Sequence, residues 1–99
     1  MNSLEEVRAA IDAIDDELVA LLARRQGYVE QAATFKRDAT EVRGAERRRL
    51  VMERIRERAE AAGLAPDVAD AVWTAMIDAF IALELEAHAR DQGGPPATS

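Results

Sequence analysis

Residues 4–35 read LEEVRAAIDAIDDELVALLARRQGYVEQAATF and carry the clearest structural signal in the chain. Apolar side chains recur at two positions of a seven-residue repeat. One position holds Leu4, Ile11, Leu18 and Ala32, with Arg25 in place of an apolar residue, and the other holds Val7, Ile14, Leu21, Tyr28 and Phe35. Such a pattern over about five heptads is typical of a long helix that packs along another helix. Ser3 and Glu6 have capping-box spacing, which predicts that the helix begins there.

The expected length of this helix predicts a homodimer. A helix over residues 3–38 would be roughly 50 Å long at ~1.5 Å per residue. A compact domain of this size has a radius of gyration of only about 13 Å. The rest of the chain is too short to cover both ends of such a rod, so a second copy of the chain is expected to bury its apolar seam.

Two further helices are expected, which makes the predicted fold all-α with three helices per chain. After a polar link over residues 37–44, a second helix should run over residues 45–62 and end at Gly63, since glycine commonly follows a helix end. A third should start at Pro66, because proline suits the first helical turn. The expected apolar stripes are Leu50, Val51, Ile55, Ala59 and Ala62 on the second helix, and Val72, Trp73, Met76, Ile77, Phe80, Ile81 and Leu83 on the third.

Composition bounds the domain and its partners. A chain of 99 residues suits one domain, which we place at residues 1–90, with a disordered tail over residues 91–99. There is no cysteine, so disulfides and thiolate chemistry are excluded. The net charge of −6 argues against nucleic acid as the main partner. The acidic start does not resemble a signal peptide, and no apolar run approaches the ~20 residues of a membrane span, so a cytoplasmic protein without membrane contact is expected.

Positively charged residues occupy positions of the long helix at which apolar or neutral residues are expected. Arg25 occupies the seam, where it can snorkel, pair with an acid or fix the register of the dimer. Lys36 follows eleven residues later and is therefore expected to share the helical face of Arg25. Arg8 lies about 25 Å from Arg25 along the helix, too far for one small molecule to contact both within a chain. If both serve one ligand, Arg8 must come from the partner chain.

The other two helices add one charged residue each to this set. Arg47 lies one turn before the apolar stripe of the second helix, and an inward arginine suits bidentate binding of a carboxylate. Glu84 lies on the apolar stripe of the third helix, either in a salt bridge to Arg25 or Arg47, or as a protonated acid that donates a hydrogen bond. We interpret the set as a site for a small polyanion. Neither a metal cluster nor a nucleophile accompanies it, and His88 stands alone, so no cofactor is expected.

The chain resembles the all-α class of chorismate mutases. The resemblance rests on residues 7–15 (VRAAIDAID), on residues 21–25 (LLARR), on Lys36, on Glu46-Arg47 and on Gly63-Leu64. It implies an intertwined homodimer whose long helices cross. It also implies the Claisen rearrangement of chorismate to prephenate in the shikimate pathway, without a cofactor.

The resemblance also implies a role for each candidate. Arg8 of the partner chain and Arg25 would bind the two substrate carboxylates, and Arg47 would support the site. Lys36 would hydrogen-bond the ether oxygen and a carboxylate. Glu84 falls where many members carry a glutamine that contacts the ether oxygen, and a glutamate can donate there only when protonated, so activity is expected to favour acidic pH. Gly44 and Arg48 fall where well-studied members carry acidic side chains, and Phe80 where a small hydroxyl residue is common.

Three other functions stay open at the level of sequence. Residues 28–36 and 76–81 also resemble the isochorismate-pyruvate lyases, which share this fold, and an aminodeoxychorismate-type mutase would use nearly the same site. The third interpretation is a non-catalytic helical dimer that binds a partner protein. Any regulation would have to come from such a partner, and both aromatic amino-acid synthesis and secondary metabolism use this fold.

Overall fold

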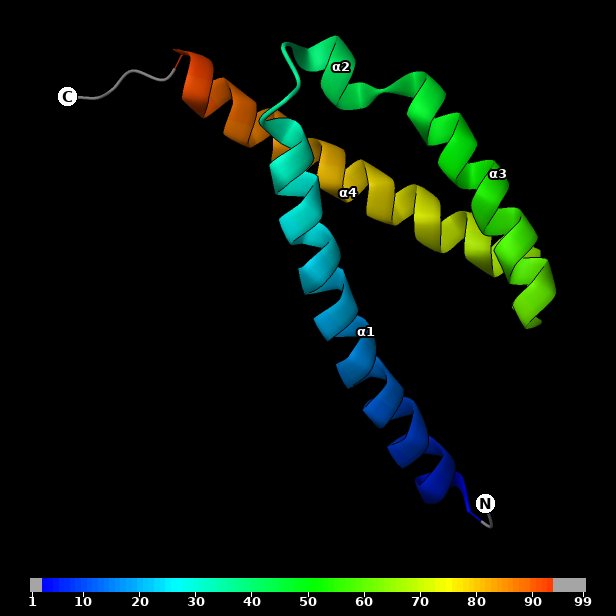
Figure 1. Cartoon of the computed structure of the whole chain (residues 1–99). Coiled ribbons are helices and arrows are strands. Elements are labelled where there is room, and N and C mark those ends of the chain that lie inside the picture. The colour runs from blue at the N-terminus through cyan, green and yellow to red at the C-terminus, as the bar shows by residue number, and fades with distance from the viewer. Residues whose placement is uncertain (1–2, 94–99) are drawn as a thin grey trace. The chain divides into compact units, whose positions relative to one another are not determined.

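The computed structural model describes residues 3–93, and the side chains of residues 3–90. The chain order of its helices is α1 (Leu4–Ala33), α2 (Ala39–Arg43), α3 (Ala45–Ala62) and α4 (Pro66–Gly93), as Figure 1 shows. No strand occurs within these described residues. The predicted all-α class with three long helices is therefore confirmed, and the short helix α2 was not predicted.

The chain divides into two units, one up to Ala32 and one from Ala33 onward. The first unit is almost entirely α1. Its start agrees with the prediction, since the backbone N–H of Glu6 donates to the Ser3 hydroxyl at 3.1 Å. No residue of α1 is buried, and seam residues such as Ile14 are about half exposed. The unit formed by α1 therefore has no buried core of its own.

Helix α1 ends earlier than predicted. It stops at Ala33 rather than at residue 38, and the chain turns so that the N–H of Lys36 donates to the carbonyl of Ala33 at 3.1 Å. Asp38 then adopts an extended backbone, with φ −154° and ψ 176°, and accepts a hydrogen bond from the N–H of Glu41. Because Asp38 caps a new helix, it cannot continue the old one. The prediction that Lys36 shares a helical face with Arg25 is therefore wrong.

The second unit is built on α3 and α4, which lie side by side (Figure 1). Helix α3 has the predicted bounds and ends at Gly63, whose φ of 78° lies in the left-handed region that favours glycine. Ala59 on α3 and Ala69 and Ile77 on α4 are buried. Small residues at two of these positions let the helix axes approach closely, which is how the pair forms a core without any large, fully buried side chain.

The predicted apolar stripes are only partly covered. Val51 and Ile55 on α3 are half-buried, but Leu50 is exposed. On α4, Val68 and Val72 are exposed as well, so this helix has an apolar face other than the one with Ile77. Both long helices of the second unit therefore present apolar surface that the unit itself leaves open.

The connection and the end of the chain complete this unit. Helix α2 packs on α4, with Val42 only 3% exposed. Gly44, at φ 46° and ψ 60°, is at once the C-cap of α2 and the N-cap of α3, so one left-handed residue joins the two helices. Helix α4 continues to Gly93, so residues 91–93 of the predicted disordered tail are helical. The predicted disorder of residues 94–99 lies outside the described residues.

Candidate active site

The central contact of the candidate site is an ion pair between Lys36 and Glu84. The Lys36 ammonium donates to a Glu84 carboxylate oxygen at 2.9 Å, although the two residues are 48 positions apart in sequence. Lys36 comes from the turn after α1, and Glu84 lies on α4. The side chain of Glu84 is 7% exposed and that of Lys36 28% exposed. Two residues singled out from the sequence are thus brought together in one unit.

Burial explains why these two groups need each other. A carboxylate removed from water is strongly destabilised unless it is paired and hydrogen-bonded. A salt bridge of Glu84 was one of the two alternatives predicted from the sequence, with Arg25 or Arg47 as its partner, and within this unit the structure shows one with Lys36. Lys36 is also the only lysine among the chain's basic residues. A lysine provides a compact point charge with three donors, which can hold Glu84 and still contact a further acceptor.

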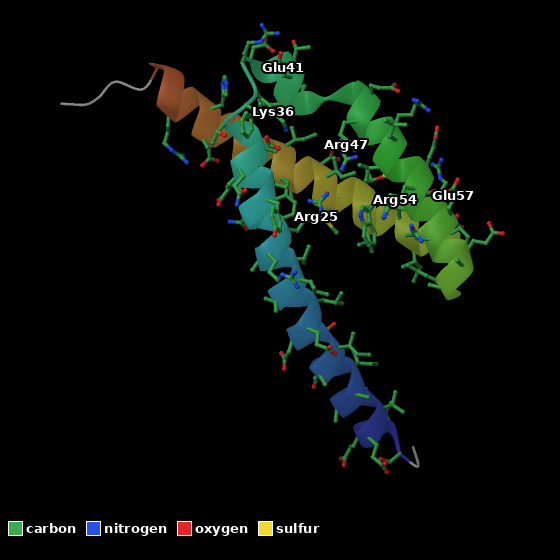
Figure 2. All side chains as sticks on the ribbon, in the orientation of Figure 1. Arg25, Lys36, Glu41, Arg47, Arg54 and Glu57 are labelled. Atoms are coloured by element: carbon green, nitrogen blue, oxygen red, sulfur yellow. The ribbon has the colours of Figure 1, made fainter. Side chains whose placement is uncertain are left out.

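Arg47 lies in the same unit, in the first turn of α3 (Figure 2). Its side chain is exposed, and it makes no ion pair with the residues that the structure describes. The prediction that Arg47 faces inward is therefore wrong within the single chain. The guanidinium is instead available to a group from outside the chain, either a ligand or a second protomer.

Arg8 and Arg25 lie on α1, in the other unit. Arg8 is exposed, whereas Arg25 is half-buried. The helix is continuous between them, which separates them by about 25 Å along its axis. This confirms the geometric premise that one chain cannot bring both to the same small ligand.

A second cluster, which we call the α2 clasp, follows directly after Lys36 and consists of Arg37, Asp38 and Glu41. The Glu41 carboxylate accepts hydrogen bonds from the backbone N–H of Arg37 at 2.7 Å and from its guanidinium at 3.0 and 3.1 Å. The N–H of Glu41 in turn donates to Asp38 at 3.0 Å. The sequence analysis missed this cluster, although Asp38 and Glu41 have the spacing of a capping box.

The clasp favours the charged form of its carboxylate. The hydrogen bond from the Arg37 backbone, followed by those from its guanidinium, holds the pKa of Glu41 below its ordinary value. A lowered pKa means that the clasp is fully formed at neutral pH, and that its contribution is lost only as the pH falls through the lowered pKa.

Three of the six arginines of α3 pair with acids on the surface. Arg48 pairs with Asp78 at 2.7 Å and Arg56 with Asp70 at 3.0 Å, and both pairs join α3 to α4. Arg49 pairs with Glu46 at 2.6 Å, and this contact lowers the pKa of Glu46. Such exposed pairs contribute little stability each. Arg47 is not among these paired arginines, so it stays a candidate for ligand binding.

Other kinds of site find no support in the described part of the chain. No group of three or more histidine, cysteine, aspartate or glutamate side chains there could hold a metal ion. No helix in it is long and apolar enough to cross a membrane.

The described part of the chain is all-α, and in it Lys36 pairs with the buried carboxylate of Glu84. The chain belongs to the family described as chorismate mutase type II, whose sequence profile matches residues 7–85. The match includes all five candidate residues, from Arg8 to Glu84. A curated relative, the isochorismate pyruvate lyase of Pseudomonas aeruginosa, is 29% identical over 92 residues, which cover 93% of this chain and 91% of the relative. Family membership thus narrows the activity to that of a chorismate mutase or a related lyase.

Proposed function

We propose that this protein is a chorismate mutase, which converts chorismate to prephenate. The observation that carries the proposal is the Lys36–Glu84 pair, a cation and a carboxyl group held 2.9 Å apart in a mostly buried position. In this rearrangement a carbon–oxygen bond of the substrate's ether breaks while a new carbon–carbon bond forms within the same molecule. The reaction has no external nucleophile and no net proton transfer, so binding, orientation and electrostatics supply the catalysis.

Arginines would hold the substrate in its reactive shape. Chorismate is a flexible dianion, and fixing both of its carboxylates favours the chair-like conformation in which the reacting carbons meet. Arg25 would bind one carboxylate and Arg8 of the partner chain the other, with Arg47 as support. Guanidinium groups suit this task because their planar fork can bind a carboxylate through two hydrogen bonds.

Lys36 and Glu84 would act on the ether oxygen, where negative charge develops as the bond breaks. An ammonium placed at that oxygen stabilises the transition state more than the substrate. A protonated Glu84 would add a second hydrogen bond. In the structure Glu84 accepts from Lys36, so the pair would rearrange when the substrate supplies a competing acceptor for the ammonium.

The site requires a homodimer. Support comes from the apolar seam of α1, where Ile11, Ile14 and Leu18 are about half exposed, and from the exposed apolar face of α4 at Val68 and Val72. Exposed apolar surface on this scale is typical of a protein interface. An intertwined dimer with crossed α1 helices would bury these faces and deliver Arg8 to the site of the partner chain.

A second candidate function is an isochorismate-pyruvate lyase. It is favoured by the name of the Pseudomonas aeruginosa relative, an isochorismate pyruvate lyase, and by the similar length of the two chains. The same arginines and lysine would bind the substrate, and the difference would lie in which isomer fits.

The proposal is tested by the rate of chorismate consumption in the wild type and in Arg25→Ala and Lys36→Ala. Removing a charge that stabilises the transition state should lower kcat by about 10²–10³-fold. Chorismate should also raise the melting temperature of the wild type, because a ligand that binds only the folded state stabilises it. Unchanged melting, together with no turnover, would contradict the proposal and favour a non-catalytic dimer.

A further inference from the structure

Lys36 has no regular secondary structure to hold it in place. It follows the turn at the end of α1 and precedes Asp38, where α2 is capped. Its backbone N–H donates to Ala33 at 3.1 Å, which orients only the N-terminal side of the residue. The position of its ammonium therefore depends on what fixes the chain on its C-terminal side.

The α2 clasp provides this fixation. Arg37, the residue next to Lys36, is bonded to Glu41 through both its backbone and its guanidinium, with three hydrogen bonds between 2.7 and 3.1 Å. Since the backbone N–H of Arg37 belongs to the peptide that links it to Lys36, Glu41 holds that peptide directly.

The clasp is in turn anchored to the helix that carries Glu84. Val42, next to Glu41, is buried at 3% exposure, and α2 packs on α4. The clasp thus connects the Arg37 peptide to α4, on which Glu84 accepts from Lys36. Figure 2 labels Lys36, in the segment that follows α1, and Glu41 on α2.

We propose that Glu41 is a positioning residue that holds Lys36 at Glu84 through the α2 clasp. This inference rests on the proposed function for its kinetic consequence, but its structural part is independent of any substrate. Arg37 is largely exposed, so its pair with Glu41 contributes little to global stability. The effect of losing the carboxylate should therefore be local, and it should fall on Lys36.

Because Lys36 is the only lysine, its reactivity can be measured without interference from another side chain. The first experiment measures the rate at which an acylating reagent modifies Lys36 in the full-length protein, located by peptide mass. Glu41→Gln and Arg37→Gln, which break the clasp from opposite ends, should each raise this rate by about threefold or more, because a locally opened segment frees the ammonium. Glu84→Gln removes the ion pair itself, so its labelling rate should be the highest that the two clasp variants can reach.

Glu53→Gln is the matched control, since Glu53 also forms an exposed pair with an arginine four residues away, Arg49, but lies on α3 apart from the clasp. It should leave the labelling of Lys36 unchanged. Circular dichroism identifies any variant that has lost helix. Equal labelling in the wild type, Glu41→Gln and Arg37→Gln would overturn the inference.

The second experiment measures kinetics. Glu41→Gln should lower kcat/KM by about tenfold, because a small displacement of a group that contacts the reacting atoms has a large effect on rate. In a Lys36→Gln background it should have no further effect, since residues that act through one another are not additive. An equal loss in both backgrounds would overturn the inference. If the proposed function were wrong, the wild type would be inactive while the labelling difference persisted. Failure of the proposed function is therefore distinguishable from failure of this inference.

Discussion

At the residue scale, Glu84 stands where the family resemblance leads us to expect glutamine in many members. A glutamine amide can donate to an ether oxygen, whereas a carboxyl group donates only when it carries a proton. In the structure Glu84 is a buried acceptor of the Lys36 ammonium. Replacing its carboxyl group by an amide therefore tests the role proposed for this position.

We predict that Glu84→Gln raises kcat. The amide of the variant can donate to the ether oxygen, whereas the Glu84 carboxylate accepts from the Lys36 ammonium in the structure. Glu86→Gln, which replaces an exposed acid on the same helix, serves as control. An unchanged or lower kcat in Glu84→Gln would refute the role assigned to Glu84.

At the scale of helices, the prediction from sequence succeeded wherever a local signal determined a boundary. Gly63 and Pro66 marked the end of α3 and the start of α4 correctly, because each residue acts through its own backbone geometry. The end of α1 was mispredicted because its apolar repeat continues to Phe35, whereas the competing cap at Asp38 starts a new helix. Periodicity alone could not decide between these two signals.

The site was predicted less completely than the helices. Lys36 and Glu84 were each identified as candidates, but their pairing was not, because it joins residues 48 positions apart through the packing of α2 on α4. No periodic pattern encodes such a tertiary contact. The exposure of Arg47 has a related cause, since a stripe computed on one helix does not show whether a neighbour covers it.

Substitution of two glycines by alanine should change the free energy of unfolding in opposite directions, and this tests the helix assignments. Gly27 lies within α1, and an added Cβ there would meet no atom within 4 Å, so Gly27→Ala should stabilise the protein by about 0.5–1 kcal/mol. An added Cβ at Gly63 would also meet no atom within 4 Å, but the residue has a φ of 78°, which is unfavourable for alanine. Gly63→Ala should therefore destabilise the protein by about 1–2 kcal/mol. Chemical denaturation measures both changes. Equal effects in the two variants would contradict the assigned backbone conformations.

At the scale of the whole molecule, we propose that two chains build each site together. A mixture of Arg8→Ala and Lys36→Ala tests this directly. Each variant alone should be nearly inactive, whereas a heterodimer would contain one site with both substitutions and one intact site. Random exchange of subunits in an equal mixture should then restore about a quarter of the wild-type activity. A monomer in light scattering, or a mixture as inactive as its parts, would rule out the shared site.

Chorismate mutase activity is tested most directly by product analysis after separate incubation of the purified protein with chorismate and with isochorismate. We predict prephenate from chorismate as the faster reaction, lost in Arg25→Ala and Lys36→Ala. Salicylate and pyruvate from isochorismate, formed at a much higher rate than prephenate, would contradict it and make the protein a lyase.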